Sequence, residues 1–127
     1  GASTRLHPSA DVLSALVELT PEYVCDVFNA AVPDHPDVQY RSYAGQSGRG
    51  TDASINPLLR VQNHLLYGRE GLNDGLVSVE SAQWGDFRGA ILADHAEQVG
   101  LRLLPGDGFD ADAFYLDRAR ELRDEGF

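Results

Sequence analysis

The sequence lacks several features that mark particular classes of protein. It holds a single cysteine, Cys25, so no disulfide can form within it. No stretch approaches the roughly 18 consecutive apolar residues of a transmembrane helix, and no secretory signal sequence is visible. Its 10 basic residues are scattered among 20 acidic ones, which gives a net charge of −10 without a basic cluster. A membrane span and a nucleic-acid partner are therefore not expected.

What the chain does have is ordinary for a globular protein. Hydrophobic residues make up 43% and charged residues 24% of its 127 residues. This composition is too apolar for a disordered chain. A chain of this length can bury about two-thirds of the surface that its unfolded form exposes. We therefore expect it to fold, as one small domain or as part of a larger one.

The hydrophobic patterns predict an α/β fold. Residues 1–8 look irregular. Apolar stripes predict two helices in tandem over residues 9–19 and 20–31, the second of which begins with Thr20 as its cap. Cys25 lies in that second helix, where we expect it to be a small buried apolar residue. Further patterns predict strands over residues 38–44 and 87–93, and helices over residues 55–68 and 110–127.

Asp74 and His95 are the first candidates for catalysis. Asp74 lies in the turn-forming sequence Asn-Asp-Gly, and His95 follows an apolar run, residues 89–93, that predicts a buried strand. An acid and a histidine at two neighbouring strand ends can meet. In hydrolases a carboxylate fixes the tautomer and orientation of a histidine, which then takes a proton from a nucleophile. Asp94 is the less favoured acid, because a direct neighbour of His95 points in a different direction along the chain.

The segments around these two residues resemble a known family. "NDGLVSVESAQWG" (residues 73–85) and "ADHAEQVG" (residues 93–100) are similar to the C-terminal part of bacterial true lipases, the triacylglycerol lipases of the Pseudomonas and Burkholderia type. In that family a near-identical Asn-Asp-Gly-Leu-Val carries the acid of the catalytic triad, and a His-Leu-Asp-Glu motif carries its histidine. "VQYRSYAG" (residues 38–45) and the helix before it also resemble the family. The resemblance covers roughly residues 19–127.

The resemblance implies a fold, a division into parts and a location. Residues 9–127 would form the C-terminal part of an α/β-hydrolase domain, with residues 9–32 as cap-like or lid-like helices over the substrate. The chain order of nucleophile, acid and histidine in α/β-hydrolases fits Asp74 before His95. The family also suggests a secreted, extracellular protein.

The nucleophile that this family requires has no match in the chain. The family's serine lies in a Gly-x-Ser-x-Gly elbow between a strand and a helix, upstream of the acid. The nearest sequence here is Gly45-Gln46-Ser47-Gly48-Arg49, which has arginine in place of the second glycine. We interpret Ser47 as a loop serine. The serine and the oxyanion hole are then expected in an N-terminal portion that these 127 residues do not include, and that portion would be a partner of this chain.

The resemblance also implies a structural calcium ion next to the triad. Oxygen-rich ligation needs several carboxylates or carbonyls around the ion. The positions that match the family's calcium aspartates hold Asn56 and Glu97 here, which keeps an oxygen at each but alters the site. Gln98 is close to the position of a further expected glutamine without matching it. Calcium is therefore a weaker expectation than the catalytic pair.

The sequence thus predicts part of a serine ester hydrolase that acts on carboxylic esters, most simply those of lipids. Asp74 would orient His95, and His95 would act as general base and then general acid. Two other readings stay open. The chain could be a non-catalytic binding or regulatory module derived from a hydrolase, or a small self-contained hydrolase that uses Ser47, which would then lie within about 3 Å of His95.

Overall fold

The computed structural model describes residues 17, 18, 20–101 and 108–127. The chain divides into two compact units, Gly1–Val38 and Gln39–Phe127, and each is described here by itself. The predicted irregular segment at residues 1–8 and most of the predicted helix at residues 9–19 lie outside the described residues.

The first unit contains a continuous helical run. It consists of α2 (Pro21–Tyr23), η1 (Val24–Phe28), which has π-helical hydrogen bonding, and α3 (Asn29–Ala31). Thr20 caps the run, because its hydroxyl oxygen accepts a hydrogen bond from the Tyr23 N–H at 3.3 Å. The predicted helix start is confirmed. The expected burial of Cys25 is wrong, since the thiol is exposed and η1 buries none of its residues.

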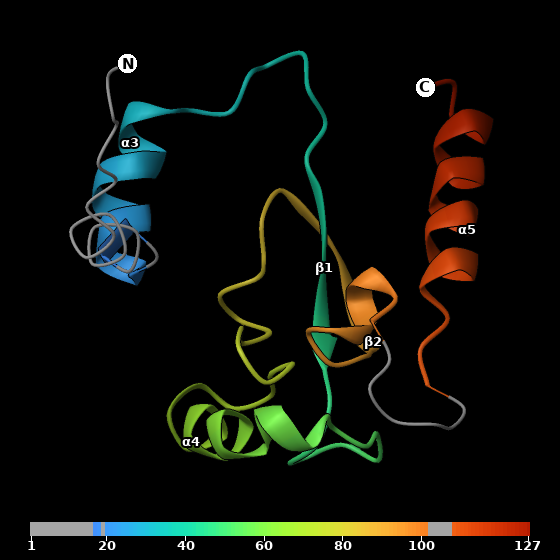
Figure 1. The fold of residues 1–127 in the computed structure, drawn as a ribbon. Coiled ribbons are helices and arrows are strands. Elements are labelled where there is room, and N and C mark those ends of the chain that lie inside the picture. Colours follow the sequence, from blue (N-terminus) through green and yellow to red (C-terminus); the bar gives the residue numbers. More distant parts are fainter. Residues whose placement is uncertain (1–16, 19, 102–107) are drawn as a thin grey trace, which may run out of the picture. The chain divides into compact units, whose positions relative to one another are not determined.

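The second unit is built on a parallel pair of strands (Figure 1). The strands β1 (Arg41–Gln46) and β2 (Asp86–Leu92) pair from Arg41 opposite Asp86 to Gln46 opposite Leu92, with one irregularity near Ser42. Both predicted strands are present. The first one begins later than predicted, because the Val38 N–H bonds the His35 carbonyl oxygen and thereby closes a turn ahead of it.

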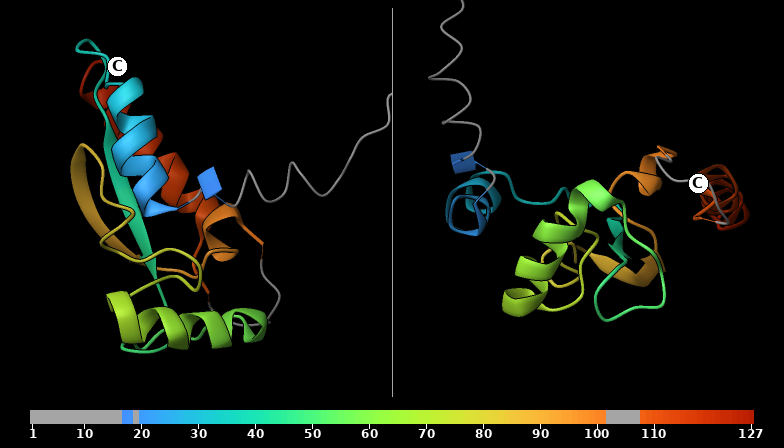
Figure 2. Two further views of the ribbon diagram at one scale, coloured as in Figure 1. Left: turned by 90° about the vertical axis from the view of Figure 1, so that its left-hand side faces the viewer. Right: turned by 60° about the horizontal axis from the view of Figure 1, so that its bottom comes forward.

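Two longer helices complete this unit. The short 3₁₀ turn η2 (Pro57–Leu59) leads into α4 (Arg60–Glu70), which lies at the carboxyl end of β1 in the views of Figures 1 and 2. Another 3₁₀ turn, η3 (Glu97–Val99), follows β2. The last helix, α5 (Ala111–Asp124), is capped by the Asp110 carboxylate, as an acidic helix start predicts.

Polar and aromatic contacts attach α5 to the strands, as expected of a closing helix. The Arg118 guanidinium donates to the Tyr43 hydroxyl at 2.9 Å, and the Phe114 ring meets the Tyr43 ring edge-on at 5.1 Å. Arg88 of β2 pairs with Glu121 at 2.9 Å. The chain is therefore of mixed α/β class, with a two-stranded parallel sheet among its described residues.

The most deeply buried part of the second unit is polar. Among the described residues, the buried apolar side chains belong to Ala44, Ile55, Ala93 and Ala111. The buried polar ones are more numerous: Ser47, Asn56, Asn63, Asn73, Asp74, Ser78 and Asp94. Most of them follow the carboxyl ends of the strands or the end of α4, so the predicted catalytic residues lie in this region. No helix among the described residues is long and apolar enough to cross a membrane.

Candidate active site

The Asp74 turn is folded by its own side chains. The Asp74 Oδ1 atom accepts hydrogen bonds from the Leu76 and Val77 N–H groups at 2.9 and 2.8 Å, and the Asp74 N–H bonds the Val77 carbonyl oxygen. Gly75 adopts φ of 104°, a conformation that glycine reaches without the penalty of a side chain. These bonds hold Oδ1 against the backbone and leave Oδ2 facing the strand ends.

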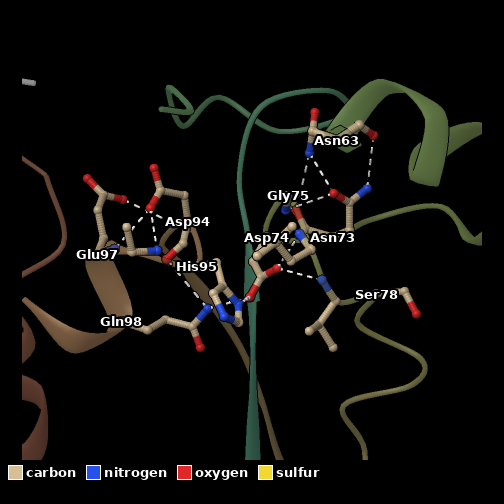
Figure 3. Close-up of polar contacts among 12 residues, drawn as sticks. Asn63, Asn73, Asp74, Gly75, Ser78, Asp94, His95, Glu97 and Gln98 are labelled. Carbon is tan, nitrogen blue, oxygen red and sulfur yellow. Dashed lines mark hydrogen bonds and ion pairs between the residues drawn. The ribbon is translucent and has the colours of Figure 1, made fainter. Parts of the chain in front are cut away.

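His95 meets that second oxygen. Its Nδ1 atom lies 2.9 Å from Asp74 Oδ2, and its backbone N–H donates to the Asp74 carbonyl oxygen, also at 2.9 Å (Figure 3). An ionised carboxylate only accepts hydrogen bonds, so Nδ1 carries the proton in this contact. In the neutral imidazole, Nε2 then keeps its lone pair and is the basic nitrogen. Two residues 21 positions apart thus form an oriented acid–histidine pair.

The two members of the pair differ in exposure. The Asp74 side chain is 4% exposed and the His95 side chain 48%. Within the described ranges, Nε2 of His95 makes no hydrogen bond. A buried carboxylate that fixes a half-exposed imidazole is the arrangement that lets the outer nitrogen take a proton from a third group.

A pair of buried asparagines supports the acid turn from behind. Asn63 of α4 donates through Nδ2 to Asn73 Oδ1 at 2.8 Å, and Asn73 returns a bond through its own Nδ2 to the Asn63 carbonyl oxygen at 3.2 Å. Asn73 Oδ1 also accepts from the Gly75 N–H. Asn63 further bonds the Ser47 carbonyl oxygen and the Arg49 N–H. This network, the Asn63–Asn73 bridge, ties α4 and the loop after β1 to the residue before Asp74.

Asp94 has a different role from Asp74. Its Oδ1 accepts from the Ala96 and Glu97 N–H groups, both at 2.9 Å, and its Oδ2 accepts from the Asn56 N–H at 2.9 Å. Glu97 in return accepts from the Asp94 N–H at 3.0 Å, a reciprocal capping arrangement. The donors to the Asp94 carboxylate are all backbone N–H groups, so the choice of Asp74 over Asp94 as the acid agrees with the geometry.

Ser47 is not placed as a nucleophile. It directly follows β1, is fully buried, and its backbone bonds Asn73 and Asn63. Its hydroxyl oxygen has no hydrogen-bond partner among the described residues, His95 included. This geometry favours the interpretation of Ser47 as a structural loop serine over the self-contained hydrolase.

The residues expected at a calcium site are engaged in other contacts. Asn56 Oδ1 accepts from the Leu58 N–H at 3.0 Å, and Glu97 Oε2 accepts from the Asp94 N–H. Both Asp94 carboxylate oxygens also accept from backbone N–H groups. These oxygens therefore cap turns in a way that needs no ion, and in the part of the chain that is described no cluster of three or more acidic, histidine or cysteine side chains is placed to hold a metal. Calcium stays a prediction that this donor set does not favour.

An apolar cavity adjoins the acid turn. It has a volume of about 300 Å³ and is lined by Gln62, Leu65, Leu66, Arg69, Gly75 and Leu76. Gly75 and Leu76 directly follow the acid, so the cavity begins at the turn that holds it.

Sequence reasoning found the pair but missed its supports. Gln98 donates to Asp74 Oδ2 at 2.6 Å, a contact that the calcium interpretation did not suggest. The signal for Asn63 was weak, because it lies among other polar residues of α4, although an asparagine within a helix often has a specific partner. Comparison with known proteins adds no assignment: no family model matches this chain, and no curated protein matches it.

Proposed function

We propose that this chain supplies the acid and the histidine of a serine ester hydrolase, as the C-terminal part of an α/β-hydrolase. One observation carries the proposal. The buried Asp74 carboxylate holds Nδ1 of the half-exposed His95 at 2.9 Å, and Nε2 is left without a partner among the described residues. The similarity of residues 73–85 and 93–100 to true lipases supports it independently.

The reaction follows from this geometry. The serine Oγ bonds the ester carbonyl carbon while its proton passes to Nε2 of His95. When the bond between that carbon and the alcohol oxygen breaks, His95 returns the proton to the departing alcohol. Water then attacks the acyl-serine, again giving a proton to Nε2, and the carboxylic acid leaves as the serine is restored. Throughout, Asp74 keeps Nδ1 protonated and stabilises the positive imidazolium.

The remaining parts of the catalytic machinery would come from an N-terminal portion. The 127 residues contain no Gly-x-Ser-x-Gly sequence, and the hydroxyl of the buried Ser47 makes no hydrogen bond with His95. A parallel sheet is normally covered on both faces and contains more than two strands. Further strands beside β1 or β2 would extend the sheet and bring the serine and the oxyanion hole to the same end as His95.

Lipid esters are the proposed substrates. The cavity next to the acid turn is lined mainly by carbon atoms of Leu65, Leu66 and Leu76. A cavity of about 300 Å³ is at the small end of the range for ligand sites. An apolar site close to the catalytic pair favours substrates with a hydrocarbon part.

The test is a fluorophosphonate probe, whose phosphorus bonds the activated serine as fluoride leaves. The protein is isolated under native conditions together with whatever polypeptide accompanies it, and the labelled residue is located by peptide mass spectrometry. We expect label on a serine of a Gly-x-Ser-x-Gly elbow outside residues 1–127, and loss of that label in His95→Ala. The 127-residue chain alone should hydrolyse no ester. Label on Ser47, or hydrolysis by the chain alone that His95→Ala abolishes, would contradict the proposed division.

The other candidate is a binding or regulatory module descended from a hydrolase. It is favoured by the single observation that, within the described ranges, no nucleophile lies against Nε2 of His95. In that case no serine anywhere would react with the probe in a manner that depends on His95. Asp74→Asn would then change no activity of any sample.

A further inference from the structure

The Asp74 oxygen that binds the histidine has a second side-chain partner. Gln98 donates from Nε2 to Asp74 Oδ2 at 2.6 Å, and His95 donates from Nδ1 to the same oxygen at 2.9 Å. Gln98 lies in η3, three residues after His95, and its backbone N–H bonds the Asp94 carbonyl oxygen at 3.2 Å. Figure 3 shows the glutamine amide and the imidazole side by side at the carboxylate.

The strand β1 leaves a space that Gln98 occupies. At Gly45 a Cβ atom would meet the Gln98 amide nitrogen, would lie 2.8 Å from its Cδ, and would lie 2.9 Å from the Ala93 carbonyl oxygen. Separations below about 3 Å from a backbone oxygen are not tolerated without a shift of the chain. Position 45 therefore has room only for glycine, because the Gln98 side chain, which reaches Asp74, fills the space that a Cβ atom would take.

These two features explain how the carboxylate is fixed. It accepts four N–H donors, two on each oxygen: Leu76 and Val77 on Oδ1, and His95 and Gln98 on Oδ2. Gln98 is neutral, so it adds a donor without adding a charge that would compete with the imidazolium. The shared oxygen is restrained by two donors, and part of its hydrogen-bonding capacity is taken by Gln98 and not by His95.

We propose that Gln98 is a positioning residue for the Asp74–His95 pair and that Gly45 provides the slot through which it reaches the carboxylate. The catalytic meaning of this inference rests on the proposed function, but its geometry can be tested without an activity assay. Removing the amide leaves Oδ2 with His95 as its single donor. The His95–Asp74 bond should then become shorter and stronger while the carboxylate loses one of its restraints.

The test uses the folded chain and the magnetic resonance signals of the His95 ring nitrogens, read through the carbon-bound ring protons. Gln98→Met keeps the length of the side chain and removes the donor. We expect the Nδ1 nitrogen and its proton to move downfield relative to the wild-type chain. Gly45→Ala, which displaces the glutamine, should shift them in the same direction. Gln83→Met, at an exposed glutamine, is the matched control and should leave them unchanged.

A double-mutant cycle separates a positioning role from a general structural one. If Gln98 acts through Asp74, Gln98→Met should have no effect on the ring signals in an Asp74→Asn background. The carboxylates of Asp94 and Glu97 are the other charges on this turn, and they keep their backbone partners in every variant. A Gln98→Met chain with wild-type ring signals, or a shift that persists in Asp74→Asn, would overturn the proposal. Either result leaves the probe experiment on the serine unaffected, so failure of this inference is distinguishable from failure of the proposed function.

Discussion

Two aspartates on neighbouring turns show how the same side chain serves two purposes. As whole residues, Asp74 and Asp94 are both buried, at 3% and 4% exposure, and both oxygens of each carboxylate accept hydrogen bonds. Asp94 accepts only backbone N–H groups, from Asn56, Ala96 and Glu97. Asp74 gives one oxygen to the backbone and the other to side chains, of which His95 carries a titratable ring.

The difference lies in what each carboxylate can control. A carboxylate bonded only to backbone N–H groups determines the course of the chain, because those groups have a single role. A carboxylate that directs one oxygen at an imidazole also determines the tautomer and the orientation of that ring. The Asp94 turn therefore delivers His95 to its place, and the Asp74 turn determines what His95 does there.

The largest expected effect is a loss of catalytic rate that follows substitution of Asp74 but not of Asp94. In the proposed assembly with a serine-bearing portion, Asp74→Asn should lower kcat by about 10⁴-fold, because the amide no longer enforces the Nδ1–H tautomer. His95→Ala should cost about 10⁴-fold or more. The measurement is the rate of hydrolysis of a short-chain ester. Asp94→Asn is the matched control, and an equal loss there would mean that the turns are not distinct.

The second effect concerns the support behind Asp74. Asn63→Leu should lower the free energy of unfolding by about 3 kcal/mol, because it removes the side-chain partner of the Ser47 carbonyl, the Arg49 N–H and Asn73 Oδ1. Urea unfolding measures the change. The neighbouring exposed substitution Gln62→Leu should stay within about 0.5 kcal/mol of the wild-type chain. Equal stabilities for the two variants would show that the Asn63–Asn73 bridge is not formed.

A smaller loss of stability is expected when Asp94 is substituted. Asp94→Ala removes the acceptor of the Ala96, Glu97 and Asn56 N–H groups, so the free energy of unfolding should fall by about 2 kcal/mol. Urea unfolding again reports the difference, with Glu80→Ala as an exposed acidic control. A stability close to that of Glu80→Ala would mean that the turn does not depend on its carboxylate.

The smallest effect lies far from both turns and depends on pH. The hydrogen bond from Arg41 lowers the pKa of the Glu125 carboxyl below its ordinary value of 4.5. A lowered pKa stabilises the folded state above that ordinary value, and the contribution is lost as pH falls through the folded one. The protection factors of the α5 amides, which are corrected for the intrinsic exchange rate at each pH, should therefore fall slightly between about pH 5 and about pH 3. In Glu125→Gln this acid-dependent part should vanish, and an unchanged profile would contradict the assignment.

Much of the fold followed from local patterns. The alternation around Tyr40 and Ser42 and the apolar run after Phe87 predicted the two strands. The patterns over residues 55–68 and 110–127 predicted helices, and the structure has η2 leading into α4 in the first range and α5 in the second. The acid–histidine contact was also predictable, because the Asn-Asp-Gly turn and the end of a strand are recognisable in the sequence.

The rest depends on contacts between segments that are distant in the sequence. The parallel register of β1 and β2 and the hydrogen bonds of Asn63 arise only when α4 and the strands assemble. The π-helical hydrogen bonding of η1 has no local marker in its sequence. Gln98 was interpreted through a possible ion, and the tight approach of Gly45 that guides it toward Asp74 has no sequence pattern.

The most direct measurement of the central claim is the magnetic resonance signal of the His95 Nδ1 proton in three chains: wild type, Asp74→Asn and Asp94→Asn. The account predicts a downfield Nδ1 proton in the wild-type chain, its loss in Asp74→Asn, and its retention in a folded Asp94→Asn chain. A signal that survives in Asp74→Asn, or that depends on Asp94 in a chain that remains folded, would contradict the assignment of Asp74 as the acid that orients His95.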